Sequence, residues 1–150
     1  MNRSVHGDFR DYPPPATTTL IVADPVYGDL SMYTDLLAFK LPTILFMDPK
    51  TLSYLPEPDD IAFWIKPVST KNTTKHYGRF LEAIAFYRTS MNTDLHWSNR
   101  TGIFTDHLLS NEEHPWKKPE ILIERLIRNH YPGSGIIYDP CAGSRTVETV

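Results

Sequence analysis

Short apolar runs recur along this chain of 150 residues, and their length predicts strands. They are too short and too continuous for surface helices, and a continuous apolar run is typical of a strand covered on both faces. Thirteen prolines punctuate the sequence around them. The runs are Leu20–Ala23, Thr43–Met47, Ile61–Ile65, Glu82–Tyr87 and Ile136–Tyr138.

Helical patterns alternate with the expected strands. Ser31 is a candidate N-cap for a helix that runs to about Phe39, and Asp48-Pro49 combines an N-cap with a proline at the first helical position. The clearest helix spans Pro119–Asn129, and its apolar positions form one stripe. That stripe consists of Leu122, Ile123, Leu126 and Ile127. Strands that alternate with helices predict a single α/β domain over residues 1–150 with a largely parallel sheet.

Composition and charge narrow the function classes. A net charge of −3 argues against a protein that coats nucleic acid by bulk attraction, so any basic surface must be local. The local candidate contains Lys66, Lys71, Lys75 and Arg79, in a stretch without an acidic residue, and its alternative interpretation is a solvated loop. No run is long and apolar enough to cross a bilayer and the N-terminus lacks the apolar core of a signal peptide, so we expect a cytoplasmic protein without a membrane partner.

Two strand ends carry candidate chemistry. The run Ile21–Ala23 leads into Asp24-Pro25-Val26-Tyr27, where a carboxylate and a carbonyl could accept hydrogen bonds from an amine while the tyrosine ring stacks on a flat group. The run Ile136–Tyr138 leads into Asp139 and a turn of small residues, which lets backbone amides approach a ligand. Each pattern also occurs in ordinary turns, so neither is decisive alone.

The order of these pieces resembles the β subclass of S-adenosylmethionine-dependent DNA amino-methyltransferases. His6-Gly7-Asp8 with Asp24-Pro25-Val26-Tyr27 is similar to its "GD…DPPY" block. Phe63-Trp64-Ile65-Lys66-Pro67 and Gly78-Arg79-Phe80-Leu81-Glu82 resemble its middle strands. His114-Pro115-Trp116-Lys117-Lys118-Pro119 is similar to its "H-P-x-x-K-P" segment, and Asp139–Thr146 stands where the family has "DPFxGSGT". Four motifs in one order are hard to obtain by accident.

The resemblance implies a Rossmann-like methyltransferase sandwich with circularly permuted motif order and S-adenosylmethionine as cofactor. It implies that Asp24, Pro25 and Tyr27 hold the target base. It implies a cofactor pocket lined by Lys118, Pro119, Asp139, Pro140, Cys141, Gly143 and Ser144. The substrate would be an exocyclic amine in DNA or RNA, and the aspartate of the first motif favours N6 of adenine over N4 of cytosine.

Some features depart from the family pattern and keep alternatives open. Val26 replaces the second proline, Arg145 replaces a glycine, and little sequence follows the cofactor motif, so we expect a fold that is incomplete at the C-terminus unless a homodimer or another subunit complements it. The main alternative is an inactive protein of the same fold that serves as a binding or assembly subunit, and a third is a methyltransferase for small-molecule or protein amines. The six histidines are scattered and Cys141 is the single cysteine, so no metal site is expected.

Overall fold

The computed structural model describes residues 7–66, 80–92, 94, 100–105 and 118–142. Within them, each of the five predicted apolar runs forms a strand. The strands are β1 (Thr18–Ala23), β2 (Thr43–Met47), β3 (Asp60–Ile65), β4 (Leu81–Tyr87), β5 (Ile103–Phe104) and β6 (Ile136–Tyr138). The strand β5 was not predicted, because two residues are too few to show a period.

The helices follow the prediction apart from their caps. α1 (Leu30–Ala38) begins after Asp29, whose carboxylate accepts a hydrogen bond from the Ser31 amide, so the prediction of Ser31 as the N-cap is wrong. Asp48 caps a helix as predicted, but that element is the 3-10 helix η1 (Pro49–Tyr54). α2 (Glu120–His130) has Pro119 at its N-cap. Neither α-helix in the described part of the chain has the length and hydropathy needed to span a membrane.

The six strands form one mixed sheet in the order β5-β3-β4-β2-β1-β6. β1 pairs in parallel with β2 and with β6, and β3 pairs in parallel with β5. β4 lies antiparallel between β2 and β3. Five strands therefore point one way and β4 points the other way, which confirms the prediction of a mostly parallel sheet.

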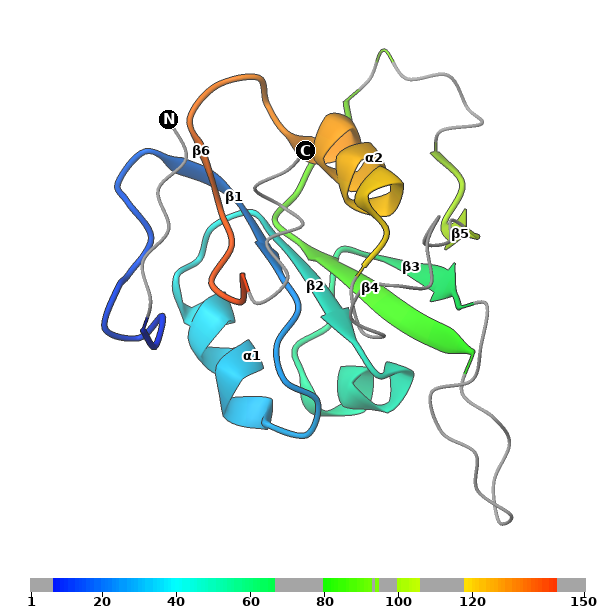
Figure 1. Ribbon diagram of the computed structural model, residues 1–150, viewed down its shortest axis with the longest axis horizontal. Coiled ribbons are helices and arrows are strands. Elements are labelled where there is room, and N and C mark those ends of the chain that lie inside the picture. Colours follow the sequence, from blue (N-terminus) through cyan, green and yellow to red (C-terminus); the bar gives the residue numbers. More distant parts are fainter. Residues whose placement is uncertain (1–6, 67–79, 93, 95–99, 106–117, 143–150) are drawn as a thin grey trace.

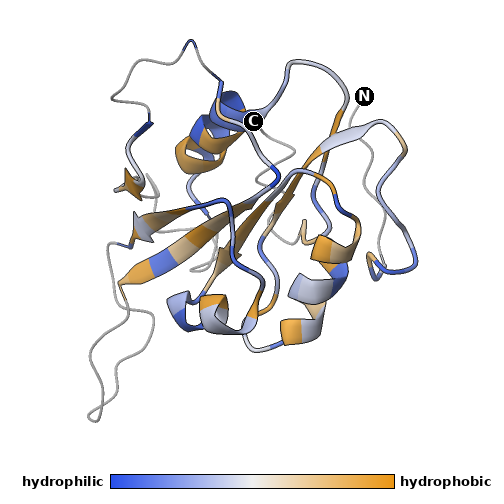
Figure 2. Ribbon diagram, turned by 180° about the vertical axis from the view of Figure 1, so that it is seen from behind, coloured by the Kyte–Doolittle hydropathy of each residue, from blue (hydrophilic) through white to orange (hydrophobic). Residues whose placement is uncertain are grey.

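Helices cover both faces of this sheet, and the strand side chains alternate between two apolar layers (Figure 1). Leu20, Val22 and Ile84 pack with the α2 stripe in one layer, and Ile21 and Ala85 pack with α1 in the other. The alternation follows from the two-residue period of a strand. Strands coloured as apolar along most of their length, between helices with one apolar side, are visible in Figure 2. The result is the α/β sandwich that the sequence predicts.

A tight turn brings β6 alongside β1. Gly135 has a φ of 92°, in the left-handed region, and a side chain on it would lie 2.7 Å from the carbonyl oxygen of Thr17 and against the Thr19 side chain. The same approach lets the Ile136 amide donate to that carbonyl over 2.9 Å, and the Thr19 hydroxyl donates to the carbonyl of Ser134 over 2.9 Å. Glycine at this position thus permits β6 to enter the sheet.

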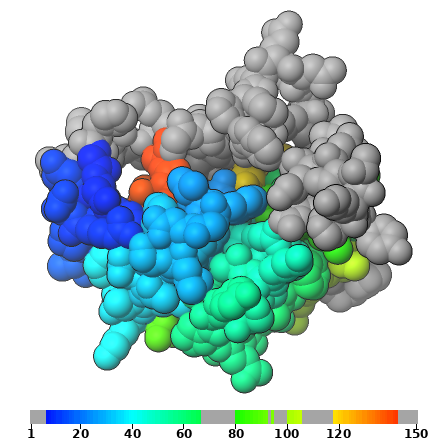
Figure 3. Space-filling view, turned by 90° about the horizontal axis from the view of Figure 1, so that it is seen from below, coloured from blue at the N-terminus to red at the C-terminus, as the bar shows by residue number. Residues whose placement is uncertain are grey.

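The parallel pairing of β1 and β6 places their carboxyl ends at one edge of the sheet. Ile21 is in register with Tyr138, so Asp24 and Asp139 both follow the ends of adjacent strands. The two acidic strand ends therefore lie side by side. Seen toward this edge, the orange-red segment around residue 140 lies between the N-terminal segment and the light-blue segment that follows β1 (Figure 3). In parallel sheets this edge is where ligands bind.

Candidate functional site

Four charged side chains from four separate segments meet at this edge, on the face of the sheet that α2 covers. The alternation explains the meeting: Asp24 continues the positions of Leu20 and Val22 in β1, whose side chains pack against α2. Lys66 stands two residues beyond Trp64 of β3, and Glu82 stands two residues before Ile84 of β4, both in the same layer.

Lys118 directly precedes Pro119 at the start of α2, and its ammonium group contacts two other members of the group. Its Nζ lies 2.6 Å from Oδ2 of Asp24 and 2.8 Å from Oε1 of Glu82. The other oxygen of Glu82, Oε2, lies 2.7 Å from Nζ of Lys66. The order Asp24, Lys118, Glu82, Lys66 therefore alternates in charge, and we call these four residues the charge cluster.

The charge cluster runs from the interior toward solvent. The side chains of Glu82, Lys118 and Lys66 are 1%, 7% and 9% exposed, whereas that of Asp24 is 34% exposed. Glu82 is the charged residue near the start of the otherwise apolar strand β4. Buried charges persist only when they are paired, and two carboxylates with two ammonium groups balance each other. Asp24 is the member of the charge cluster that can meet a ligand.

Aromatic rings surround the two lysines. Nζ of Lys118 lies 5.2 Å from the ring centre of Phe46, 5.7 Å from that of Trp64 and 6.0 Å from that of Tyr27. Nζ of Lys66 lies 5.8 Å from the rings of both Tyr27 and Trp64. These distances suit attraction between a cation and an aromatic face.

Tyr27 joins the charge cluster to the surface. The residue is 42% exposed, and the carboxylates of Glu82 and Asp24 lie close enough to act on its hydroxyl electrostatically. Burial, and next the nearby carboxylate charges of Glu82 and Asp24, raise the pKa of Tyr27 well above its ordinary value. The hydroxyl is therefore protonated at neutral pH, and much of the ring remains accessible.

The charges act on one another's protonation. Burial raises the pKa of Asp24 and the nearby Glu82 adds to this, while the ammonium groups of Lys118 and Lys66 act in the opposite direction, and the pKa stays above its ordinary value. Burial lowers the pKa of Lys118, but Asp24 and Glu82 together outweigh it and the pKa is raised. Lys118 is thus a firm cation, and the charge of Asp24 depends on its neighbours.

The second predicted motif lies directly beside the first. The Cys141 amide donates to Oδ1 of Asp139 over 2.9 Å and shapes the turn after β6. This turn follows the strand that pairs with β1, and burial, with the nearby charges of Asp139 and Asp24, raises the pKa of the Cys141 thiol to about 12. Asp139, Pro140 and Cys141 therefore adjoin Asp24, while Gly143 and Ser144 lie outside the described residues.

The predicted basic surface changes in composition. Lys66 is buried and paired with Glu82, so its prediction as part of an exposed basic stretch is wrong, because β3 ends at Ile65 and carries the next side chain into the α2 layer. Lys71, Lys75 and Arg79 lie outside the described residues. The sequence interpretation missed Glu82 as a site residue, although its two-residue spacing from Ile84 was a usable signal.

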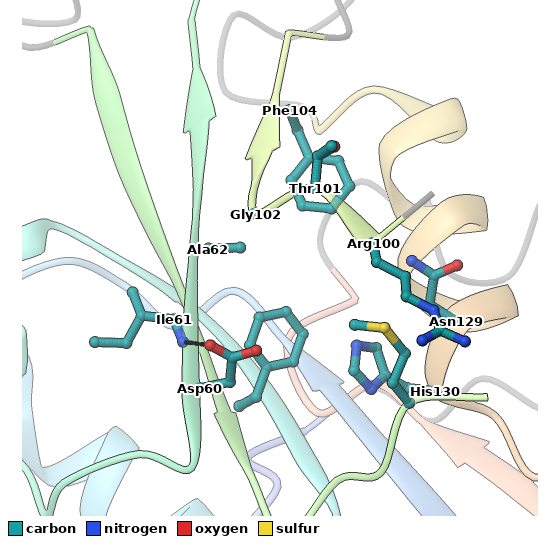
Figure 4. A pocket seen from close by; sticks show the side chains of 11 residues that line it. Asp60, Ile61, Ala62, Arg100, Thr101, Gly102, Phe104, Asn129 and His130 are labelled. Atoms are coloured by element: carbon teal, nitrogen blue, oxygen red, sulfur yellow. Dashed lines mark hydrogen bonds between the residues drawn. The ribbon is translucent and has the colours of Figure 1, made fainter. Parts of the chain in front are cut away.

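A cavity of about 180 Å³ lies at the opposite edge of the sheet, and Figure 4 shows the side chains that line it. It is formed where β3 begins and α2 ends, with Asp60, Arg100 and His130 among its lining residues. His130 stacks on Phe86 with 4.7 Å between ring centres, and burial lowers its pKa. The described residues of the two strand-end motifs do not line this cavity. Among the described residues, no group of three or more His, Cys, Asp and Glu is placed to hold a metal ion.

Comparison with known proteins identifies the fold. The sequence matches no family model and no curated protein. The structure of an M1.HpyAVI-SAM complex matches with a TM-score of 0.64 at 19% identity, over 93% of this chain and 78% of that chain. A further M1.HpyAVI structure matches with a TM-score of 0.60 at 19% identity, over 94% and 78% of the chains. TTHA0409 of Thermus thermophilus, provisionally named a DNA modification methylase, matches with a TM-score of 0.56 at 19% identity, over 93% and 79%. The chain has the Rossmann-like fold of these proteins.

Proposed function

We propose that this chain is an S-adenosylmethionine-dependent methyltransferase that acts on the exocyclic amine of a nucleic-acid base, with N6 of adenine in DNA as its preferred target. The observation that carries the proposal is the position of Asp24 and Tyr27, partly exposed, directly beside the turn at Asp139–Cys141. The fold adds support, since one matched structure is named as a complex with SAM and another as a DNA modification methylase.

Asp24 and Pro25 would hold the target amine. The nitrogen of an aromatic amine is a weak nucleophile, because its lone pair is delocalised into the ring. A carboxylate oxygen of Asp24 and the carbonyl of Pro25 can accept the two amine hydrogens, which favours a pyramidal nitrogen with its lone pair available. The contribution is positioning and hydrogen bonding, so no strong base is required.

Tyr27 would hold the plane of the base. Its ring is partly accessible, so it offers a stacking surface beside Asp24. A base inside a duplex cannot reach this position, so the target must leave the helix or be single-stranded. The stacking surface does not distinguish between bases, and the preference for adenine is the finer part of the proposal.

The turn after β6 would hold the cofactor. Bound S-adenosylmethionine supplies a methyl group already activated on a sulfonium. The described residues suit its hydroxyl and amino groups, because Asp139 provides a carboxylate and the turn through Pro140 and Cys141 is narrow. From the motif, Gly143 and Ser144 would belong to the same wall, and Pro119 at the start of α2 would line the pocket too. Lys118, which the sequence assigned to the cofactor wall, contacts Asp24.

The test is transfer of a labelled methyl group from S-adenosylmethionine to unmethylated DNA and RNA, followed by nucleoside analysis for N6-methyladenine and N4-methylcytosine. Asp24→Ala removes one preorganised hydrogen-bond acceptor and should lower the rate about a hundredfold to a thousandfold, by analogy with the loss of one transition-state hydrogen bond. Asp11→Ala is the matched control, because Asp11 is an exposed aspartate outside the site, and its rate should equal that of the wild type.

Two results would contradict the proposal. An active wild type whose rate survives Asp24→Ala would exclude Asp24 from the reaction. Absence of methyl transfer together with absence of calorimetric heat at millimolar S-adenosylmethionine would exclude the enzyme and favour the binding or assembly subunit.

A further inference from the structure

The other three members of the charge cluster are buried next to Asp24, and the proposed chemistry assigns a role to none of them. They are Lys118, Glu82 and Lys66. We propose that Lys118 and Glu82 are positioning residues of this site: Lys118 keeps Asp24 ionised and aims its carboxylate, and Glu82 holds Lys118 where it can do so. The inference rests on the proposed function for the role of Asp24, and it adds two residues to that function.

The contact geometry gives Lys118 its role. Its Nζ contacts Asp24 through Oδ2 at 2.6 Å, a charge-assisted hydrogen bond that fixes the rotation of the carboxylate. Within the described residues, the Asp24 carboxylate accepts one hydrogen bond, through Oδ2. Oδ1 is therefore the oxygen available to a target amine. A protonated carboxyl would be a poorer acceptor for that amine, so the charge of Lys118 serves the proposed reaction.

Glu82 is the counterion that permits this arrangement. An ammonium group that is 7% exposed needs more than one partly solvated carboxylate to balance the loss of water. Glu82 lies within 2.8 Å of Lys118 and 2.7 Å of Lys66, between the two cations. The two cations that it balances also lie 5.8 Å and 6.0 Å from the ring centre of Tyr27, so Glu82 holds the lysines beside the stacking ring as well. Both arms of the proposed base site therefore depend on Glu82.

The charge cluster acts on Asp24 with opposite signs. The ammonium groups of Lys118 and Lys66 favour the ionised form of Asp24, and the carboxylate of Glu82 favours its protonated form. Tyr27, which follows β1, and Tyr33, on α1, also face Asp24 and are neutral, because burial raises the pKa of each.

Among the described residues, Cys141, which follows β6, also faces Asp24, and its thiol is likewise neutral because burial raises its pKa. Substitutions at the lysines and at Glu82 must therefore move the titration of Asp24 in opposite directions. A general loosening of the fold would move it one way only.

The first experiment needs neither cofactor nor nucleic acid. The side-chain carboxyl carbon of Asp24 is titrated by carbon-detected NMR and assigned by its absence in Asp24→Asn. Lys118→Met should raise the pKa of Asp24, Lys66→Met should raise it by less, and Glu82→Gln should lower it. Lys50→Met, at an exposed lysine outside the charge cluster, should leave it unchanged. A Lys118→Met protein with an unchanged or lower pKa would overturn the inference, as would a Glu82→Gln protein with a higher one.

The second experiment follows activity. The acid limb of kcat against pH should move up in Lys118→Met and down in Glu82→Gln, with about a tenfold rate change below the limb for each pH unit moved. Lys118→Arg, which keeps the charge, should restore the wild-type limb.

If circular dichroism shows that Glu82→Gln does not fold, Lys118→Met and Lys66→Met still decide the outcome. The variants could show the expected changes in the pKa of Asp24 while the wild type transfers no methyl group. That result would refute the proposed function and leave the electrostatic role of Lys118 and Glu82 standing. An acid limb that stays at its wild-type pH in both Lys118→Met and Glu82→Gln would refute the inference.

Discussion

Removal of the Lys118 charge should destabilise the fold by an amount that grows with pH. Lys118→Met keeps most of the side-chain volume and leaves the carboxylates of Asp24 and Glu82 facing each other. At a separation of about 5 Å and an effective dielectric constant of about 20, two such charges repel by about 3 kcal/mol. Breaking a buried ion pair typically costs about 3–5 kcal/mol. Because the Asp24 side chain is 34% exposed, we expect about 3 kcal/mol at pH 8.

The sign of the pH dependence follows from proton binding. Burial already holds the pKa of folded Asp24 above its ordinary value of 3.8, and loss of the Lys118 ammonium raises it further. Between the folded pKa values of wild type and variant, the folded variant binds more protons than the folded wild type. The difference in unfolding free energy between the two proteins therefore increases as pH rises through that window. Below the window Asp24 is protonated in both proteins, and part of the loss disappears.

The assay is urea unfolding at several pH values from 5 to 8.5, with tryptophan fluorescence as the signal. Lys50→Met provides the control, because Lys50 is exposed and its loss should change the free energy of unfolding by less than about 0.5 kcal/mol. A loss below about 1 kcal/mol in Lys118→Met at pH 8, or a loss that stays constant with pH, would refute the coupling between Lys118 and Asp24.

Three further predictions concern single residues. Tyr27→Phe keeps the stacking ring and should leave substrate binding nearly unchanged, while Tyr27→Ala should weaken it by about 1–3 kcal/mol, both measured in a titration with oligonucleotide. Cys141 should react with iodoacetamide at pH 8 at least roughly a hundredfold more slowly in the folded than in the urea-unfolded protein, by mass spectrometry, because burial raises its thiol pKa to about 12. Gly135→Ala should lower the unfolding free energy by about 1–3 kcal/mol more than Gly133→Ala, since both positions have positive φ but only Gly135 lies against neighbouring atoms.

The sequence predicted the fold well where the signal was local. Continuous apolar runs located five strands, and their alternation with helices predicted a mostly parallel sheet. The direction of β4 was not predicted, because the two-residue period of a strand is the same in parallel and antiparallel pairs. Asp29 was missed as a cap because Ser31 has an equally favourable residue type for that position.

The candidate site was predicted in part, for a similar reason. Asp24, Tyr27 and the turn at Asp139 follow from motifs that are contiguous in sequence. The partners of Asp24 do not, because Lys118 meets it across 94 positions and Glu82 stands near the start of an otherwise apolar strand. Burial of a charged residue in such a strand costs free energy unless an opposite charge pairs with it. Glu82 was therefore itself the signal for a buried cation.

The charge cluster also bears on how the protein reaches its folded state. Its members stand at positions 24, 66, 82 and 118, so the cluster closes only after β1 to β4 have paired and the start of α2 has docked on them. Until that moment each charge can remain hydrated, and nothing is gained by desolvating one before the others. The contacts should therefore be absent from the transition state for folding, and substitutions there should accelerate unfolding while the folding rate stays nearly unchanged. The lifetime of the folded molecule, as well as the orientation of one carboxylate, depends on four side chains that meet late.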